Sequence, residues 1–549
     1  MITSVIVKII GAVYKIPLTA FIGAVGRGYF ASAYNICIPI HAITMGAFPI
    51  ALSRLISSYN SKGDKVMTDA LKKSAHRMFF VVGVVGMAIM LVFAKPYSVY
   101  IAKSPDSLLT ILVLAPSVLF SCLAASYRGY YEGFMNMVPT SVSQTIEAVF
   151  KMLFGLLFAK ITMSYMYNEY LETGTLFSQT IFNDTQALSV IYPYSSAAAI
   201  LGVTVGSFLS FVYVFIYSKS KTSSTLLVSK ADTSLATKEL LTFSFSIMVS
   251  CAVQSVFQFL DTASVQYSLA GIDPIVLKRA FSQSLSLNSV SDKDLVMYVY
   301  GLLNASLDFK NLVPGVTMAL GVCAVPAISN AFEQKDFQRL KTLSDSIIKY
   351  TVMLSTFAGV FIAVESNSIL NLFYSSSQDM VAGCNHLVKM FGVTVWSYCL
   401  AGVSVFCVQA VGKPQKSIAP YVFSGVVRVL LNLLLVSDEN VMLYGCVISG
   451  FVGYIIIAVW NFVVFVKTSC ISLDCFRCFV RPSICVALTL VLYKLLIAII
   501  VLSHSAIVVF LIKFAIFSII YVLLSIIFKN LEIIEIFYVI KYKKSGLNT

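Results

Sequence analysis

Charge is scarce in this sequence, and so are the residue clusters that hold metals. Charged residues occupy only 12% of the 549 positions, about half the share found in ordinary soluble domains. No nucleophile, base and acid set, phosphate-binding loop or metal signature is found in a polar segment, which argues against an enzyme. No disulfide framework, metal site or cofactor is expected, because the one cluster of cysteines has neither a second C-x-x-C pair nor a nearby histidine. That cluster consists of Cys470, Cys475, Cys478 and Cys485.

Apolar residues dominate the chain instead. Hydrophobic residues make up 58% of the sequence, and the mean hydropathy is +0.87. Runs of about 20 apolar residues recur along the chain, each long enough to cross a hydrocarbon core about 30 Å thick as a helix. We therefore predict an all-α integral membrane protein with about fourteen transmembrane helices. The predicted spans are 3–23, 29–55, 78–95, 107–127, 139–162, 191–217, 240–264, 300–330, 346–374, 387–411, 416–436, 441–466, 481–503 and 506–528.

Basic residues indicate which side of the membrane is cytoplasmic. The net charge of +14 comes from lysines and arginines in short connections, without a basic face of stacking aromatics, so nucleic acid is not an expected partner. Most of these residues, Arg128 among them, fall on one side, which the positive-inside rule assigns to the cytoplasm together with both termini. The basic residues assigned to the opposite, outer side are Arg27, Lys95, Lys103, Lys160, Lys278, Arg279 and Lys293.

Short segments repeat at an offset of six predicted spans. Residues 46–53 (GAFPIALS) correspond to 325–329 (VPAIS), and 150–157 (FKMLFGLL) correspond to 427–434 (VRVLLNLL). An even offset keeps the orientation in the membrane, so we predict parallel repeats that form two pseudo-symmetric six-helix lobes plus two C-terminal helices. The predicted divisions are an N-terminal lobe at 1–217, a cytoplasmic linker at 218–239, a C-terminal lobe at 240–466, and helices 13 and 14 with a cytoplasmic tail at 467–549.

Several ionisable residues fall inside the predicted spans, where a charge costs about 2.5–3.5 kcal/mol or more and usually faces a bundle interior or a wet cavity. Glu147 and Lys151 are spaced i,i+4, so they can pair with each other, and Glu147 is equally a candidate for proton coupling. We predict a cation-rich cavity between the lobes that suits a pyrophosphate. The alternative is snorkelling or structural ion pairing. For Lys389, Lys494 and Lys513 we favour snorkelling or lobe docking. The candidate substrate-binding residues are Lys8, Lys15, His41, Lys151 and Arg428, and the candidate ion-coupling residues are Glu147 and Asp261.

Two residues in or near the predicted spans have a simple structural explanation. A lone mid-span histidine such as His41 is more often a packing residue than a ligand. Arg54, at the cytoplasmic end of the second span, is adequately explained as an interfacial anchor.

A group of motifs carries a family resemblance over spans 1 to 12. The segments are 11–19 (GAVYKIPLT), 22–28 (IGAVGRG), 127–133 (YRGYYEG), 139–147 (PTSVSQTIE) and 409–414 (QAVGKP). In combination they resemble the stage V sporulation protein B branch of the polysaccharide transporter family, within the multidrug/oligosaccharidyl-lipid/polysaccharide exporter superfamily. This chain departs from its relatives at Ala20 and Val25, where they often carry a basic and an acidic residue.

The resemblance implies alternating access between two lobes around a cavity for the polar head of an undecaprenyl-linked precursor. By position it places Lys8, Lys15, Glu147, Lys151 and Asp261 in that cavity. We therefore expect a flippase in the bacterial cytoplasmic membrane that moves an undecaprenyl-pyrophosphate-linked saccharide, such as lipid II or a polysaccharide repeat unit. The expected partners are this lipid-linked saccharide, the bilayer and cell-wall synthesis proteins.

Two other functions stay open. A cation-coupled multidrug antiporter of the related extrusion family would prefer an acidic, aromatic-lined cavity, whereas the intramembrane balance here is basic. A non-transporting scaffold for envelope or spore-coat synthesis would be insensitive to changes in the cavity.

Overall fold

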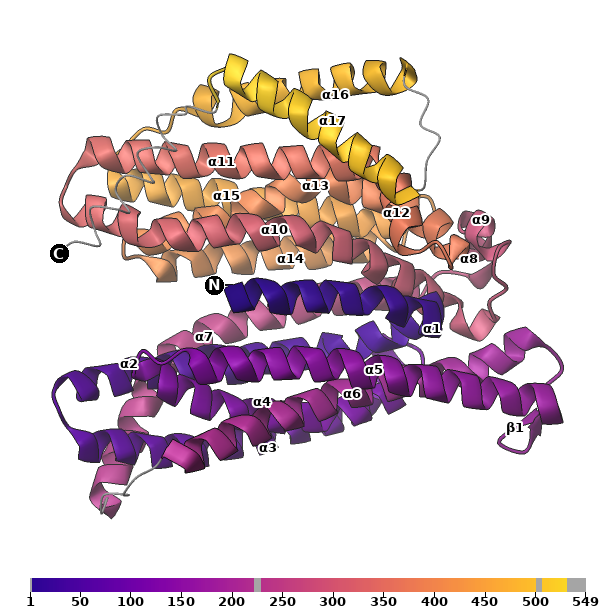
Figure 1. Ribbon diagram of the computed structural model, residues 1–549, viewed down its shortest axis with the longest axis horizontal. Coiled ribbons are helices and arrows are strands. Elements are labelled where there is room, and N and C mark those ends of the chain that lie inside the picture. Colours follow the sequence, from indigo (N-terminus) through magenta and orange to yellow (C-terminus); the bar gives the residue numbers. More distant parts are fainter. Residues whose placement is uncertain (1, 222–228, 500–505, 531–549) are drawn as a thin grey trace. The chain divides into compact units, whose positions relative to one another are not determined.

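The computed structural model describes residues 2–221, 229–499 and 506–530, and it is almost entirely helical (Figure 1). Among these residues, ten helices are long and apolar enough to cross a membrane, and the protein is a multi-pass, all-α membrane protein. The longer helices are α1 (Ile2–His41), α2 (Phe48–Ser61), α3 (Lys65–Pro96), α4 (Ser107–Gly133), α5 (Val138–Thr173), α6 (Asp184–Lys221), α7 (Lys230–Leu269), α10 (Leu295–Glu333), α11 (Phe337–Val364), α13 (Gln378–Ala410), α14 (Ile418–Leu435), α15 (Leu443–Ser469), α16 (Arg481–Ile499) and α17 (Ala506–Ile527).

Short elements connect these helices. The antiparallel strands β1 (Thr175–Leu176) and β2 (Gln179–Thr180) form a hairpin between α5 and α6. The remaining elements are the helices α8 (Pro274–Ala280), α9 (Ser282–Leu285) and α12 (Ser366–Phe373), the π-helical segments η1 (Ala42–Ala47), η2 (Tyr97–Ile101) and η5 (Phe476–Val480), and the 3-10 turns η3 (Asp292–Asp294) and η4 (Pro414–Ser417).

The predicted number of fourteen spans stays a prediction. Besides the ten apolar helices, α1 and α7 have 40 residues each and α5 has 36, enough to cross a bilayer. Helix α1 is also broken inside, at Gly23, whose φ of 61° is left-handed and is readily adopted by glycine alone. Two arms of α1 together with α5 and α7 would supply the four remaining spans.

The path from α1 to α2 is irregular for an identifiable reason. Residues 42–47 form the π-helical segment η1, and Pro49 follows directly in the first turn of α2. Proline has no backbone N–H to donate and its ring crowds the preceding turn, so the chain widens into a π turn there.

The chain divides into two compact units. Unit 1 contains residues 1–305, 376–380 and 429–445, and unit 2 contains residues 306–375, 381–428 and 446–549. Helices α10, α13, α14 and α15 therefore each contribute residues to both units. The predicted lobes at 1–217 and 240–466 are defined by pseudo-symmetry, whereas the two units are defined by contacts between residues. The units therefore do not test the lobes, which stay a prediction.

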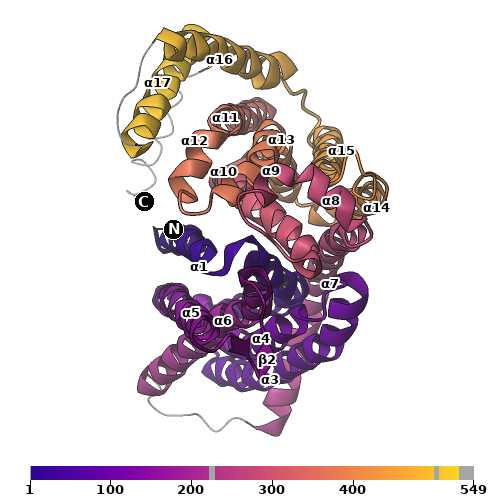
Figure 2. The ribbon, with the colours of Figure 1, turned by 90° about the vertical axis from the view of Figure 1, so that its right-hand side faces the viewer.

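Unit 1 is built on a bundle of α3, α4, α5 and α6, whose members lie side by side in Figure 2. Helices α5 and α6 pack most extensively, and a Cβ added to Gly202 would overlap the backbone of Gly155. Small residues allow such close approach, which favours association of helices inside a membrane. Helix α7 covers α2 and α3 through a core that includes Leu52, Leu71 and Leu240.

In unit 2, α16 and α17 pack on α11 and α12. The Lys513 ammonium of α17 lies 2.7 Å from a carboxylate oxygen of Glu365, next to α12. The same carboxylate accepts hydrogen bonds from Tyr493 of α16 at 2.7 Å and from Ser368 at 2.6 Å. Lys513 therefore docks the last described helix onto α12. Docking was one of the two alternatives proposed from the sequence.

Candidate functional site

A buried cation joins three helices of unit 1. Arg128 of α4 is only 7% exposed and lies 2.9 Å from a carboxylate oxygen of Glu147 on α5. Its guanidinium also donates to the hydroxyls of Ser143, at 2.8 Å, and Ser210, at 2.6 Å. The predicted end of the fourth span at residue 127 is wrong, because α4 continues to Gly133 and contains Arg128; the cytoplasmic side of Arg128 stays a prediction. The signal that could have found this site is the motif 127–133 (YRGYYEG).

Lys151 has a partner other than the predicted one. Its ammonium donates a 2.8 Å hydrogen bond to the Tyr34 hydroxyl, and it lies 5.1 Å from the Tyr34 ring centre and 5.8 Å from that of Tyr14. Glu147 forms its hydrogen-bonded ion pair with the guanidinium of Arg128, and it interacts with Lys151, its predicted partner, only electrostatically. Two cations and one carboxylate lie together here, so the group keeps a net positive charge.

Of the other candidates of α1, His41 lies close enough to Glu147 and Lys151 to interact electrostatically with both. Lys15 is half-buried, and its carbonyl accepts a 2.7 Å hydrogen bond from Thr19. His41 ends α1, with its Nε2 3.5 Å from the sulfur of Cys37 one turn earlier, which fits a packing residue. The side chain of Lys8 lies outside the described residues.

Unit 2 contains an aromatic cage around two cations. The Lys310 ammonium of α10 lies 5.4 Å from the ring centre of Phe391, 5.0 Å from that of Tyr398 and 5.3 Å from that of Tyr454. Arg428 of α14 lies 4.8 Å from the same Tyr454 ring, and the rings of Tyr398 and Tyr454 are stacked. Cation–π attraction strengthens when the groups are desolvated. Lys310 was not among the sequence candidates, because its partners come from α13 and α15.

Asp261 has a polar neighbour within unit 1. Its Oδ1 accepts a 2.9 Å hydrogen bond from the Asn432 amide of α14, which also donates to the Asp261 carbonyl at 3.2 Å. The ion-coupling role predicted for Asp261 stays a prediction.

A serine-rich pocket of about 570 Å³ lies along α2. Arg54 contributes its cation, which also lies 5.4 Å from the Phe243 ring centre. Hydroxyls and a guanidinium together suit a phosphate or sugar. Arg54 thus has a second possible role besides the predicted interfacial anchor. The pocket is lined by Ile50, Ser53, Arg54, Ser57, Ser58, Ser61, Glu132 and Met135.

Helix α1 closes tightly on the start of α10 at the predicted outer end. The Tyr29 hydroxyl donates a 2.7 Å hydrogen bond to Asp294, and the Asn35 amide donates one of 2.5 Å to Tyr300. A Cβ added to Gly28 would overlap the backbone of Met297, and one added to Gly301 would overlap that of Ala24.

A buried amide network continues this closure onto α7. Gln266 accepts a 2.6 Å hydrogen bond from the Tyr97 hydroxyl and donates one of 2.7 Å to Ser32. Helices assigned to both predicted lobes therefore meet here, with their polar groups satisfied by one another. We call this set the outer seal: Tyr29, Ser32, Asn35, Tyr97, Gln266, Asp294 and Tyr300.

Comparison with known proteins gives consistent matches over most of the chain. Residues 1–171 match the family described as "Polysaccharide biosynthesis protein", and residues 301–434 match the family described as "MatE". The chain is 24% identical over 467 residues to the lipid II flippase MurJ of Bacillus subtilis (strain 168), covering 83% of this chain and 79% of that protein. It is 21% identical over 452 residues to stage V sporulation protein B of the same organism, covering 82% and 79%. Together these matches support the predicted resemblance to the multidrug/oligosaccharidyl-lipid/polysaccharide exporter superfamily.

Solved structures of this superfamily share the fold. An inward closed conformation of the lipid II flippase MurJ matches with a TM-score of 0.69 at 15% identity, over 96% of this chain and 98% of that one. An inward-facing multidrug resistance transporter of the MATE family matches with a TM-score of 0.63 at 13% identity, over 84% and 96%. The resemblance predicted from the motifs is confirmed by the family models, the relatives and the fold together, which support a membrane transporter.

Proposed function

We propose that this protein moves a lipid-linked saccharide with an undecaprenyl-pyrophosphate carrier, such as lipid II or a polysaccharide repeat unit, across the bacterial cytoplasmic membrane. The observation that carries the proposal is the way its intramembrane cations are held. Lys151 donates to a tyrosine hydroxyl and Lys310 lies among three aromatic rings, so neither charge is cancelled by the contacts that hold it. Such groups suit an anionic head such as a pyrophosphate.

The proposed mechanism is alternating access. The cations hold the pyrophosphate, the saccharide occupies a polar cavity, and the polyprenyl tail stays in lipid. The serine pocket along α2 offers further hydroxyls and the Arg54 cation on the predicted cytoplasmic side. The outer seal has the hydrogen bonds expected of a face that opens and closes. Lys8, Lys15 and His41 remain candidates for contact with the substrate, and Glu147 and Asp261 for ion coupling.

A cation-coupled drug antiporter fits less well. Aromatic rings in unit 2 could bind an organic cation, but they already surround Lys310 and Arg428, whose charges would repel one. A scaffold role would leave Lys151 and Lys310 without a purpose. Neither an enzymatic activity nor a cofactor is part of the proposal, and cell-wall synthesis proteins are proposed as partners.

The test is complementation in a bacterium whose lipid II flippase can be switched off. We expect rescue by the unmodified protein and by Lys494→Ala, which removes an exposed cation of α16, but not by Lys151→Ala or Lys310→Ala. Purified protein in vesicles should move a labelled polyprenyl-pyrophosphate saccharide with the same pattern. Failure to move any such lipid, together with normal growth of both cavity variants, would refute the proposal.

The sidedness is tested separately. Both termini are proposed to be cytoplasmic on the basis of the charge distribution. Reporter domains that are active only in the cytoplasm or only outside, fused to either terminus, should report the cytoplasm in both cases.

A further inference from the structure

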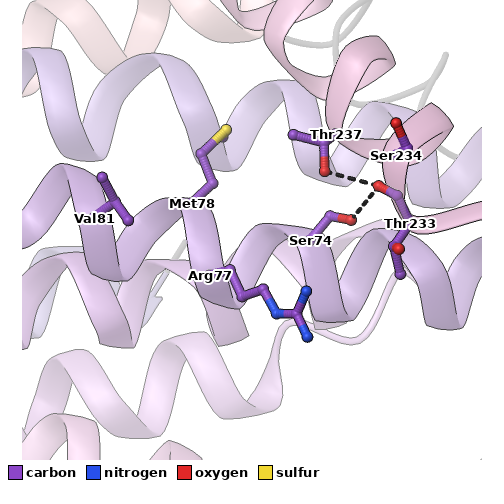
Figure 3. A pocket seen from close by; sticks show the side chains of 7 residues that line it. All are labelled: Ser74, Arg77, Met78, Val81, Thr233, Ser234 and Thr237. Atoms are coloured by element: carbon purple, nitrogen blue, oxygen red, sulfur yellow. Dashed lines mark hydrogen bonds between the residues drawn. The ribbon is translucent and has the colours of Figure 1, made fainter. Parts of the chain in front are cut away.

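A second pocket of unit 1 lies where α3 meets the first turns of α7 (Figure 3). Its volume is about 400 Å³. It shares no residue with the serine pocket along α2. The lining consists of Ser74, Arg77, Met78 and Val81 from α3 and Thr233, Ser234 and Thr237 from α7.

Two hydrogen bonds to one backbone carbonyl form the frame of this pocket, by which we mean Ser74, Thr233 and Thr237. The Ser74 hydroxyl donates to the Thr233 carbonyl at 2.9 Å, and the Thr237 hydroxyl donates to the same carbonyl at 2.8 Å (Figure 3). The first bond joins the two helices. Arg77 lies next to this frame and is exposed, so its guanidinium can reach a ligand in the pocket.

The lining changes from polar to apolar at the depth where both spans are predicted to begin. Those spans start at residues 78 and 240, and the cation and every hydroxyl of the lining precede them. Met78 and Val81 follow the start of the first span. The surface then continues with large exposed apolar side chains at steps of four residues on both helices: Val81, Val85 and Ile89 on α3, and Leu241, Phe245 and Val249 on α7.

The charge of the pocket has one sign. Its seven lining residues include one guanidinium and no carboxylate. The two acids in the first turns of α7 are engaged elsewhere, since Glu239 accepts hydrogen bonds of 2.8 Å from Tyr59 of α2 and Asp232 forms the capping box with Ser229. A planar guanidinium next to hydroxyls is a good phosphate ligand.

We propose that this pocket binds the phosphate headgroup of an anionic phospholipid of the bilayer, with Arg77 on the phosphate and the acyl chains along the apolar surfaces of α3 and α7. The cytoplasmic leaflet, on which the charge distribution places this end, is the one that presents anionic lipids to basic groups. The inference needs only the membrane location and does not depend on the transported substrate.

The experiment is native mass spectrometry of the full-length protein, purified in detergent and supplied with equal amounts of phosphatidylglycerol and phosphatidylcholine. We expect preferential retention of phosphatidylglycerol, about fivefold weaker in Arg77→Ala, as is typical for one cation near an anionic surface. Ser234→Phe fills the exposed rim with every charge kept, so it should lower retention as well. Arg339→Ala, an exposed arginine at the start of α11, is the matched control.

The outcomes separate the explanations. Unchanged retention in both Arg77→Ala and Ser234→Phe overturns the proposal, and so does an equal loss in Arg339→Ala, which would indicate general charge attraction. Complete displacement of phosphatidylglycerol by millimolar inorganic phosphate would indicate an anion site without lipid specificity and would also overturn it. Unfolding temperatures of the variants show that they are folded.

Discussion

The hydroxyl of Tyr29 donates a 2.7 Å hydrogen bond to Asp294, which lies 265 positions later in the chain. Both side chains are buried, so this bond joins α1 to the start of α10 without competition from water. A hydrogen bond to a charged group contributes about 1.5–3 kcal/mol.

Tyr29→Phe should therefore weaken the outer seal and shift the population toward an outward-open state by about tenfold or more. The measurement is modification of a cysteine placed at Ala24, a buried residue of α1 that packs against α10 at Gly301 and is not a member of the outer seal, by a membrane-impermeant thiol reagent added from outside. Tyr59→Phe is the control, because it removes a similar tyrosine–carboxylate bond, to Glu239, elsewhere in unit 1. Equal labelling of Tyr29→Phe and Tyr59→Phe would contradict the role of Tyr29.

Arg128→Gln should destabilise the protein, because it leaves Glu147 and two serine hydroxyls without their donor. Loss of one partner of a buried pair costs about 3–5 kcal/mol, and the lower value is expected here because Glu147 is 28% exposed. Chemical unfolding in detergent measures the change. The double variant Arg128→Gln/Glu147→Gln should recover part of the loss; an additive loss would mean that the pair contributes nothing.

Gly202→Ala should separate α5 from α6, since its new methyl group would overlap the backbone at Gly155. Overpacking of this kind costs about 1–3 kcal/mol and should lower the unfolding temperature. Gly450→Ala is the matched control, because its Cβ would meet a single atom, of Tyr454, at an ordinary 3.8 Å. Similar stability of the two variants would mean that α5 and α6 can move apart at Gly202 without a loss of stability.

Arg54→Ala should reduce transport without unfolding the protein, because Arg54 is an exposed lining residue of the serine pocket. We expect a loss of tenfold or more in the vesicle assay, as for a charge-assisted contact of about 1.5–3 kcal/mol. Arg54→Lys should retain part of the activity if the charge matters. Full activity of Arg54→Ala would remove the serine pocket from the proposed path.

The sequence predicted the positions of helices better than the partners of side chains. Predicted spans 481–503 and 506–528 begin where α16 and α17 begin, and residues 500–503 lie outside the described part of the chain. Such agreement is expected because a run of apolar residues must form a helix to cross a bilayer. The predicted spans 139–162 and 191–217 leave the polar residues between them as a connection, but α5 continues beyond residue 162 to Thr173 and a hairpin follows. A polar segment at a membrane surface can be a helix or a loop, and hydropathy alone does not distinguish a helix from a loop there.

Choices among partners depend on neighbours far away in the chain. Glu147 had an obvious partner at i+4, yet the structure gives it Arg128, and Lys151 takes Tyr34, 117 positions earlier. Lys310 gathers rings from α13 and α15. The types of the candidate residues could be predicted from the cost of charge in a bilayer, whereas their contacts required the fold.

The ion pair of Glu365 and Lys513 also bears on biosynthesis. Helix α17 leaves the ribosome after every other described helix, and Lys513 adds about 2.5–3.5 kcal/mol to the cost of its entry into the bilayer. Glu365, 148 positions earlier, is by then already in the membrane and can accept that charge. Insertion of α17 is thus coupled to the earlier folding of α12, so a change at Glu365 would appear as failed membrane integration of a helix translated much later.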